Sequence, residues 1–133
     1  MTEEAKRKSE YWFELATDDL DVAKTMLTSG KYLYVGFFCH LLVEKGLKAY
    51  FWCAVGKEPP YTHNLQYIAE KAGLTADMDT EQLDLLDRLM PMQIAGRYPT
   101  DKFKLLKSLD EQICLNLIND SERFLDWLKQ LKK

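Results

Sequence analysis

The hydrophobic positions of the first thirty residues recur at steps of three and four. This spacing belongs to one face of an α-helix, and the residues that follow it are Trp12, Leu15, Ala16, Leu20, Ala23 and Leu27. Gly30 comes next, and glycine readily takes the left-handed conformation with which helices often end. The pattern predicts an amphipathic first helix that stops at Gly30.

The second segment, residues 32–55, is hydrophobic on nearly every side. Its large apolar side chains are Phe37, Phe38, Leu41, Leu42, Leu47, Tyr50, Phe51 and Trp52. A helix of this kind has to be covered on more than one side, and we interpret one of the covers as another subunit. Glu44, Lys45 and Lys48 lie at its centre, where each charge would cost about 2.5–3.5 kcal/mol in a bilayer. The segment is therefore predicted to be a core helix and not a membrane span.

Residues 61–73 suit a short helix. Thr62 or Asn64 offers a side-chain oxygen that can cap its first turn. Gly73 follows the last helical position and predicts its end.

The rest of the chain predicts two more helices and no strands. Asp79 with Gln82 three residues later has the pattern of a capping box, and Pro91 stops the helix that it opens. A long last helix is predicted from about Thr100 to Leu131, with a buried stripe of Leu106, Leu109, Ile113, Leu117, Phe124, Leu128 and Leu131. No segment alternates with a period of two. We therefore predict one all-α domain over residues 1–133, an up-and-down helical bundle of about five helices.

Composition and charge suit an ordinary globular domain. The 133 residues are 47% hydrophobic and 29% charged. The formal net charge of -3 gives no general attraction to nucleic acid, so such binding would need a local basic patch. Residues 77–90 carry five acids against one base, while residues 97–107 carry four cations against one acid. The simplest interpretation is that both segments are solvated helix faces.

The three cysteines favour a cytoplasmic protein with reduced thiols. Cys39 and Cys53 lie on one predicted helix, roughly 21 Å apart along its axis, which is too far for a disulfide. Cys114 lies in an apolar stripe, where a thiol behaves as a small buried hydrophobe. The polar start, MTEEAKRKSE, does not have the pattern of a signal peptide.

Most common motifs for catalysis, cofactors or metals are absent from the sequence. It has no glycine-rich phosphate loop, no His-Glu-x-x-His, no ladder of Cys and His, and no Gly-x-Ser-x-Gly. Asp18, Asp19 and Asp21 form an acidic cluster without a partnering histidine, and a solvated helix face explains Asp18 and Asp21 better than a metal site. We therefore expect neither a cofactor nor a metal.

Two histidines remain as candidates for chemistry. His40 precedes Glu44 by four residues on one predicted helix, so the two side chains share a face. A core histidine satisfied by that carboxylate is the plain interpretation. His63 stands at the start of a short helix, where a neutral imidazole can bond a free backbone group.

Glu44 and Lys45 are costly to bury unless they are paired. Lys45 and Lys48 can extend to the rim of the bundle, or Glu44 can meet a cation from another element. Arg97 is a reasonable partner, because a two-pronged pair with Glu44 would fix its guanidinium and present it beside Tyr98.

Four stretches of the sequence, in this order, resemble the HEPN domain family. They are WFELATDDLDVAKTML, GKYLYVGFFCHLLVEKGLKAYF, YTHNL and RYP, and together they span nearly the whole chain. The resemblance implies a compact bundle of about five helices that pairs as a homodimer.

The family includes metal-independent ribonucleases, often toxins of toxin–antitoxin pairs, which carry an Arg-x4-6-His motif. If Arg97 is that arginine, the histidine should stand at position 102, 103 or 104. Those positions hold Lys102, Phe103 and Lys104. Lysine titrates near 10.4 and is a poor substitute for histidine in proton transfer near neutral pH. The ribonuclease motif is therefore incomplete.

The sequence looks instead like a noncatalytic member, a nucleotide- or substrate-binding companion of small nucleotidyltransferases. Its cations would hold the phosphates of a nucleotide or RNA, and Tyr98 would offer a stacking face. The candidate ligand-binding residues are Arg97, Tyr98, Lys102, Lys104, Glu44, Lys45 and His40. Two alternatives stay open. In the first, the chain is a divergent ribonuclease in which His40 or His63 replaces the missing histidine. In the second, Pro99 only fixes a turn and Arg97 pairs with an internal acid.

Overall fold

A computed structural model describes residues 1–93 and 98–132 of the chain. Those residues form six α-helices and two short 3-10 turns, with no strand among them. The α-helices are α1 (Glu3–Thr28), α2 (Tyr32–Ala54), α3 (Leu65–Lys71), α4 (Thr80–Leu89), α5 (Pro99–Lys107) and α6 (Glu111–Leu131), and the 3-10 turns are η1 (Thr75–Asp77) and η2 (Met90–Met92). The predicted all-α bundle is confirmed.

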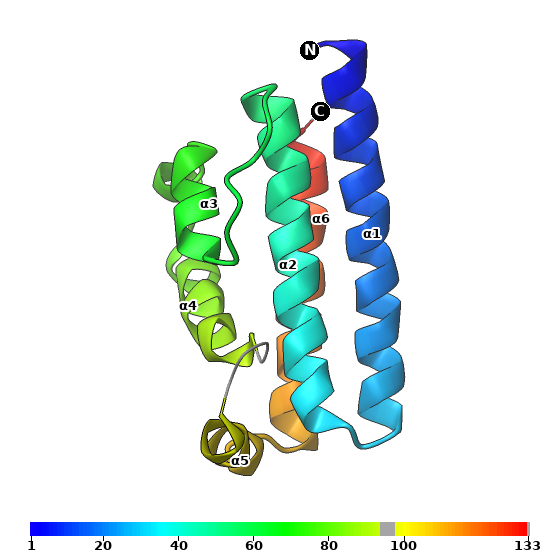
Figure 1. Ribbon diagram of the computed structural model, residues 1–133, viewed down its shortest axis with the longest axis vertical. Helices are drawn as coiled ribbons and strands as arrows, with labels where there is room; N and C mark the ends of the chain where they lie inside the picture. Colours follow the sequence, from blue (N-terminus) through cyan, green and yellow to red (C-terminus); the bar gives the residue numbers. More distant parts are fainter. Residues whose placement is uncertain (94–97, 133) are drawn as a thin grey trace.

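Helix α2 is the central element of the bundle. It runs beside α1 and α6, while α3 and α4 lie along its other side and α5 crosses near the end at which α2 begins (Figure 1). Helices α1, α6, α3, α4 and α5 all contact α2. The chain itself therefore supplies the second cover that the sequence led us to expect from another subunit. The hydrophobic surface of this helix gives no independent argument for a dimer.

Most helix ends lie where the sequence predicts them. Asn64 accepts a hydrogen bond from the Tyr67 backbone N–H at the start of α3. Asp79 and Gln82 form the expected capping box of α4, with each side chain accepting from the other residue's backbone N–H. Gly30 follows α1 with a φ of 73°, in the left-handed region that favours glycine.

The predicted last helix is wrong in one respect, because the structure divides it into α5 and α6. Asp110 begins a new helix by accepting a hydrogen bond from the Ile113 N–H at 2.8 Å. Ser108 ends the previous one, and its hydroxyl donates to the Leu105 carbonyl. The chain changes direction between them, so Leu106 and Ile113 of the predicted buried stripe are exposed. Leu131, at the far end of that stripe, is exposed as well.

The described helices give no membrane span. None of them is both long enough and apolar enough to cross a bilayer. In α2 the interrupting charges are Glu44, Lys45 and Lys48, at the positions that argued against a span from the sequence.

Candidate functional site

Glu44 is the centre of a polar cluster in the middle of α2. Its side chain is almost completely buried. One carboxylate oxygen, Oε2, accepts a hydrogen bond from Lys48 Nζ at 3.1 Å, and the other, Oε1, lies 2.9 Å from His63 Nδ1. Lys48 lies one turn along the same helix, and His63 lies in the connection that leads to α3. The buried charge is thus paired on both oxygens, as its burial requires.

His40 lies one turn before Glu44 and is 1% exposed. The predicted pair of these residues is a 3.8 Å contact between His40 Nδ1 and Glu44 Oε1, longer than a hydrogen bond. Nδ1 finds no hydrogen-bond partner among the described residues. Burial lowers the pKa of His40, although the Glu44 charge and a backbone hydrogen bond with His63 act in the opposite direction. His40 is therefore a neutral core imidazole with no access to a macromolecular ligand.

His63 has a role that the sequence did not reveal. We expected its ring to bond a free backbone group, but its Nδ1 lies at hydrogen-bond distance from the Glu44 carboxylate. Nearly two thirds of the side chain, 64%, is exposed. The contact joins residues nineteen positions apart, and no local spacing rule reports on such a pair. A buried carboxylate thus orients a solvent-exposed imidazole.

Lys45 and Lys48 are held by different partners. Lys45 Nζ lies 2.7 Å from Asp19 Oδ2 on α1. Asp19 therefore belongs to an ion pair between helices, whereas Asp18 and Asp21 are exposed, as expected for a solvated face. Lys48 also lies over the Trp12 ring, 5.7 Å from its centroid. Both lysines contribute to the packing of α1 on α2.

The remaining candidates belong to α5 and to the residues before it. Arg97, and with it the predicted contact to Glu44, lies outside the described residues. Tyr98 precedes the first turn of α5 and is 75% exposed. Lys102 is half-buried and Lys104 is exposed. Asp101 adds one negative charge to the first turn.

The structure divides the described candidates into two groups. In Figure 1, α5 lies near the N-terminal end of α2, which starts at Tyr32. Glu44 lies about three helical turns further along α2, together with Lys45 and His40. Tyr98, Lys102 and Lys104 lie at one end of the molecule, where only Lys102 is half-buried. Glu44, Lys45 and His40 lie in the middle of the bundle.

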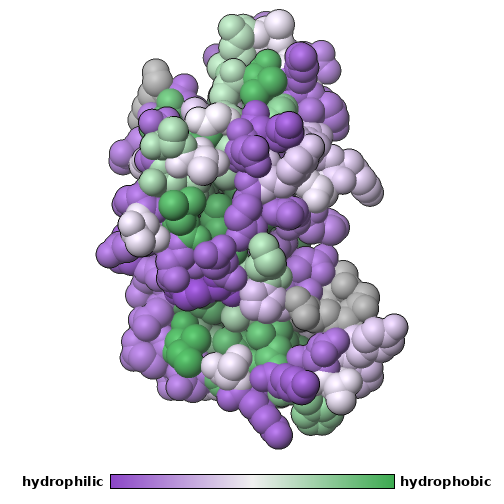
Figure 2. Space-filling view, turned by 90° about the vertical axis from the view of Figure 1, so that its left-hand side faces the viewer, coloured by the Kyte–Doolittle hydropathy of each residue, from purple (hydrophilic) through white to green (hydrophobic). Residues whose placement is uncertain are grey.

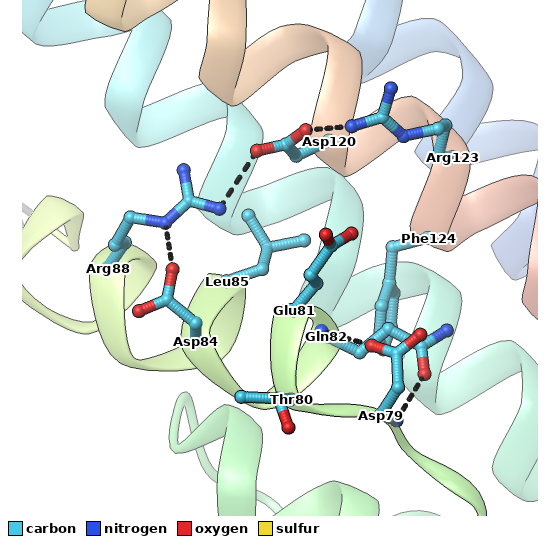
Figure 3. Close-up of a pocket in the computed structure, with 10 residues that line it drawn as sticks. All are labelled: Asp79, Thr80, Glu81, Gln82, Asp84, Leu85, Arg88, Asp120, Arg123 and Phe124. Carbon is cyan, nitrogen blue, oxygen red and sulfur yellow. Dashed lines mark hydrogen bonds and ion pairs between the residues drawn. The ribbon is translucent and has the colours of Figure 1, made fainter.

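A cavity of about 560 Å³ lies elsewhere, between α4 and α6 (Figure 3). Arg88 Nε donates to Asp84 Oδ2 at 2.8 Å, and Arg88 Nη2 donates to Asp120 Oδ2 at 2.9 Å. Asp120 also pairs with Arg123. Partial burial alone would lower the pKa of Arg88, but hydrogen bonds with Asp120 and Asp84 raise it. None of the candidate residues lines this cavity, whose lining is Asp79, Thr80, Glu81, Gln82, Asp84, Leu85, Arg88, Asp120, Arg123 and Phe124.

The sequence indicated only one of the two helices that form this cavity. The excess of acids over residues 77–90 marks α4, but Asp120 and Arg123 come from α6 and are brought to it by the packing of the two helices. Within the described residues no three His, Cys, Asp or Glu side chains are grouped so as to hold a metal ion.

Comparisons with known proteins identify the family of this fold. The family model described as "HEPN domain" matches residues 9–131. The crystal structure of an archaeal HEPN homologue is similar at 18% identity, with a TM-score of 0.73, covering 94% of this chain and 98% of that one. A crystal structure of a protein from Thermus thermophilus is similar at 15% identity and the same TM-score of 0.73, covering 92% of this chain and 97% of that one. No curated protein matches the chain significantly. This chain belongs to the HEPN domain family.

Proposed function

We propose that this chain is a noncatalytic binding module that holds the phosphates of a nucleotide or an RNA at the N-terminal part of α5. The exposure of α5 carries the proposal, because none of its nine residues is buried. Leu105 is half-buried against the core, while most other side chains of α5 are exposed and free to serve a ligand.

The chemistry of α5 suits phosphate groups. Lys102 and Lys104 offer ammonium groups, and Tyr98 offers an exposed ring on which a base can stack. Asp101 lies in the first turn and weakens the attraction of the helix N-terminus for anions. The lysines, and not the helix dipole, are therefore expected to supply most of the affinity.

The proposal is tested by fluorescence anisotropy with a labelled short RNA, with ATP and GTP as competitors. We expect Lys102→Ala/Lys104→Ala to weaken binding about thirtyfold, since each of the two lost phosphate contacts costs on the order of 1 kcal/mol. Lys6→Ala/Lys57→Ala is a matched control that removes the same charge from two exposed lysines elsewhere. Equal losses in the two variants would mean that net charge, and not α5, determines binding.

Two partners belong to the same proposal. A second copy of the chain would make a homodimer, and a small nucleotidyltransferase is the protein partner that the family resemblance suggests. A cytoplasmic location is also part of the proposal, and the three free thiols of Cys39, Cys53 and Cys114 support it.

A metal-independent ribonuclease is the second candidate function, and the His63–Glu44 pair is the observation that favours it. A carboxylate bound to one ring nitrogen fixes the tautomer of an imidazole and leaves the other nitrogen for proton transfer. His40 is too deeply buried to act on RNA. If this function holds, pure protein cleaves RNA in the presence of a chelator and His63→Ala does not. Absence of cleavage by the wild type, or equal cleavage by His63→Ala, would exclude it.

A further inference from the structure

The cavity between α4 and α6 takes no part in the proposed phosphate site. Its volume of about 560 Å³ falls in the range of small-molecule sites, roughly 300–1,000 Å³. Leu85 and Phe124, each 2% exposed, form an apolar part of its lining, but most of the lining is polar or charged. The outer side of α4 also belongs to the face shown in Figure 2, where polar surface surrounds smaller hydrophobic areas. A ligand of this cavity therefore needs charged groups of its own.

Two arginines in the lining are held by aspartates and still have N–H groups to offer. Arg88 pairs with Asp84 and Asp120, and Arg123 pairs with Asp120. A guanidinium carries five N–H groups, and Arg123 uses only Nη2 in hydrogen bonds with the described residues. Nearly three quarters of its side chain, 72%, is exposed. Arg123 can therefore bind an anionic group, such as a carboxylate, while it keeps its ion pair.

Two carboxylates in the lining are available to cationic groups. The Glu81 carboxylate makes no hydrogen bond or ion pair with any described residue. Asp79 caps α4 through Oδ1, which accepts from the Gln82 N–H, and Oδ2 is left for another donor. In Figure 3, Glu81 lies between Arg123 and Asp79. The order of available charges along the cavity is therefore one cation followed by two carboxylates.

We propose that this cavity binds a free α-amino acid with a cationic side chain, such as arginine, and is a second site apart from the phosphate site. Such a ligand has its charges in the complementary order: a carboxylate, an adjacent ammonium group and, at the end of an alkyl chain, a second cation. Arg123 binds the carboxylate, Glu81 the ammonium group and Asp79 the side-chain cation. The alkyl chain lies against Leu85 and Phe124.

A nucleotide or a metal ion suits the cavity less well. Four carboxylates against two guanidinium groups line it, so they attract a ligand of net positive charge and repel the phosphates of a nucleotide. Over residues 1–93 and 98–132, no three acids, histidines or cysteines are grouped so as to hold one metal ion. A ligand with separated charges of both signs uses the spare donors of Arg123 together with the carboxylate of Glu81.

Isothermal titration calorimetry with three related ligands tests the site on the wild-type protein. Arginine carries all three charges, agmatine lacks the carboxylate, and citrulline lacks the side-chain cation. We expect arginine to bind about tenfold more tightly than either analogue, because each analogue loses one charge-assisted hydrogen-bonded contact. General attraction to the acidic lining would instead favour agmatine, which has the largest positive charge of the three.

Three conservative substitutions assign the contacts. Arg123→Gln should remove the preference for arginine over agmatine, and Asp79→Asn should remove the preference for arginine over citrulline. Asparagine caps helices as well as aspartate does, so Asp79→Asn keeps the start of α4. Glu81→Gln should weaken arginine and agmatine alike, about tenfold, because both keep the amino group that Glu81 binds.

Matched controls are Glu70→Gln and Arg7→Gln, which change exposed charges on α3 and α1 and should leave arginine binding unchanged. Circular dichroism checks that the helices of each variant are intact. A wild type that does not bind arginine, or that binds agmatine as tightly, overturns the inference, and this ligand series needs no variant. Equal weakening by the controls would assign the binding to net charge and overturns it as well. Phosphate binding is measured separately with Lys102→Ala/Lys104→Ala and does not depend on these results.

Discussion

Glu44 shows what a buried charge needs from its neighbours. Its carboxylate is paired by Lys48 on one oxygen and by His63 on the other, and removal of either partner would leave one oxygen of a buried carboxylate without its hydrogen bond, which is costly. The need for a partner followed from the sequence, because an acid in so apolar a helix must be satisfied. The identity of the partner did not follow, since His63 reaches Glu44 only when the connection before α3 folds back along α2.

His40 makes the stability of the protein depend on pH. Burial lowers its pKa from the ordinary 6.5, so below that pH the unfolded chain takes up a proton before the folded one does. Stability is unaffected well above pH 6.5 and falls as the pH drops toward the folded pKa. The charged groups that face this ring are Glu44, Lys48 and His63.

The effect of His40 is measured by urea unfolding of wild type and His40→Gln between pH 7.5 and pH 5.5. We expect the wild type to lose more stability than the variant over this range, because glutamine takes up no proton. Parallel stability curves would show that His40 is not held neutral by burial.

Helix boundaries were predictable where a capping residue marks the first turn. Asn64, Asp79 and Gln82 cap the helices that the sequence assigned to them. The division between α5 and α6 was missed because Leu106, Leu109 and Ile113 continue a helical period across it. Asp110 carried the missing signal, since aspartate followed by Glu111 is a common helix start.

Asp110 is therefore expected to matter more than an ordinary surface aspartate. Asp110→Ala removes the oxygen that accepts from the Ile113 N–H and should cost about 1 kcal/mol, visible as a fall of a few degrees in melting temperature. Asp126→Ala, at an exposed position within α6, is the matched control. Equal melting temperatures for the two variants would mean that the cap does not hold the start of α6.

As a whole, the molecule combines a well-packed bundle with one lightly packed helix. Its central helices gather most of the buried side chains, while α5 buries none. The fold and family followed from the sequence, because helical period and the order of four short stretches are properties of the chain. The cavity between α4 and α6 did not, since its charged pairs join elements that only the tertiary structure brings together.

A thermal-shift titration of the wild type with ATP, GTP and short RNA is the first experiment to perform. A ligand that binds only the native state raises stability by about 2.7 kcal/mol at a hundred times its dissociation constant. We expect the melting temperature to rise with the concentration of at least one phosphate ligand, and we expect Lys102→Ala/Lys104→Ala to need a ligand concentration about thirtyfold higher for the same rise. No rise with any of the ligands, or the same rise in that variant, would contradict a phosphate site on α5.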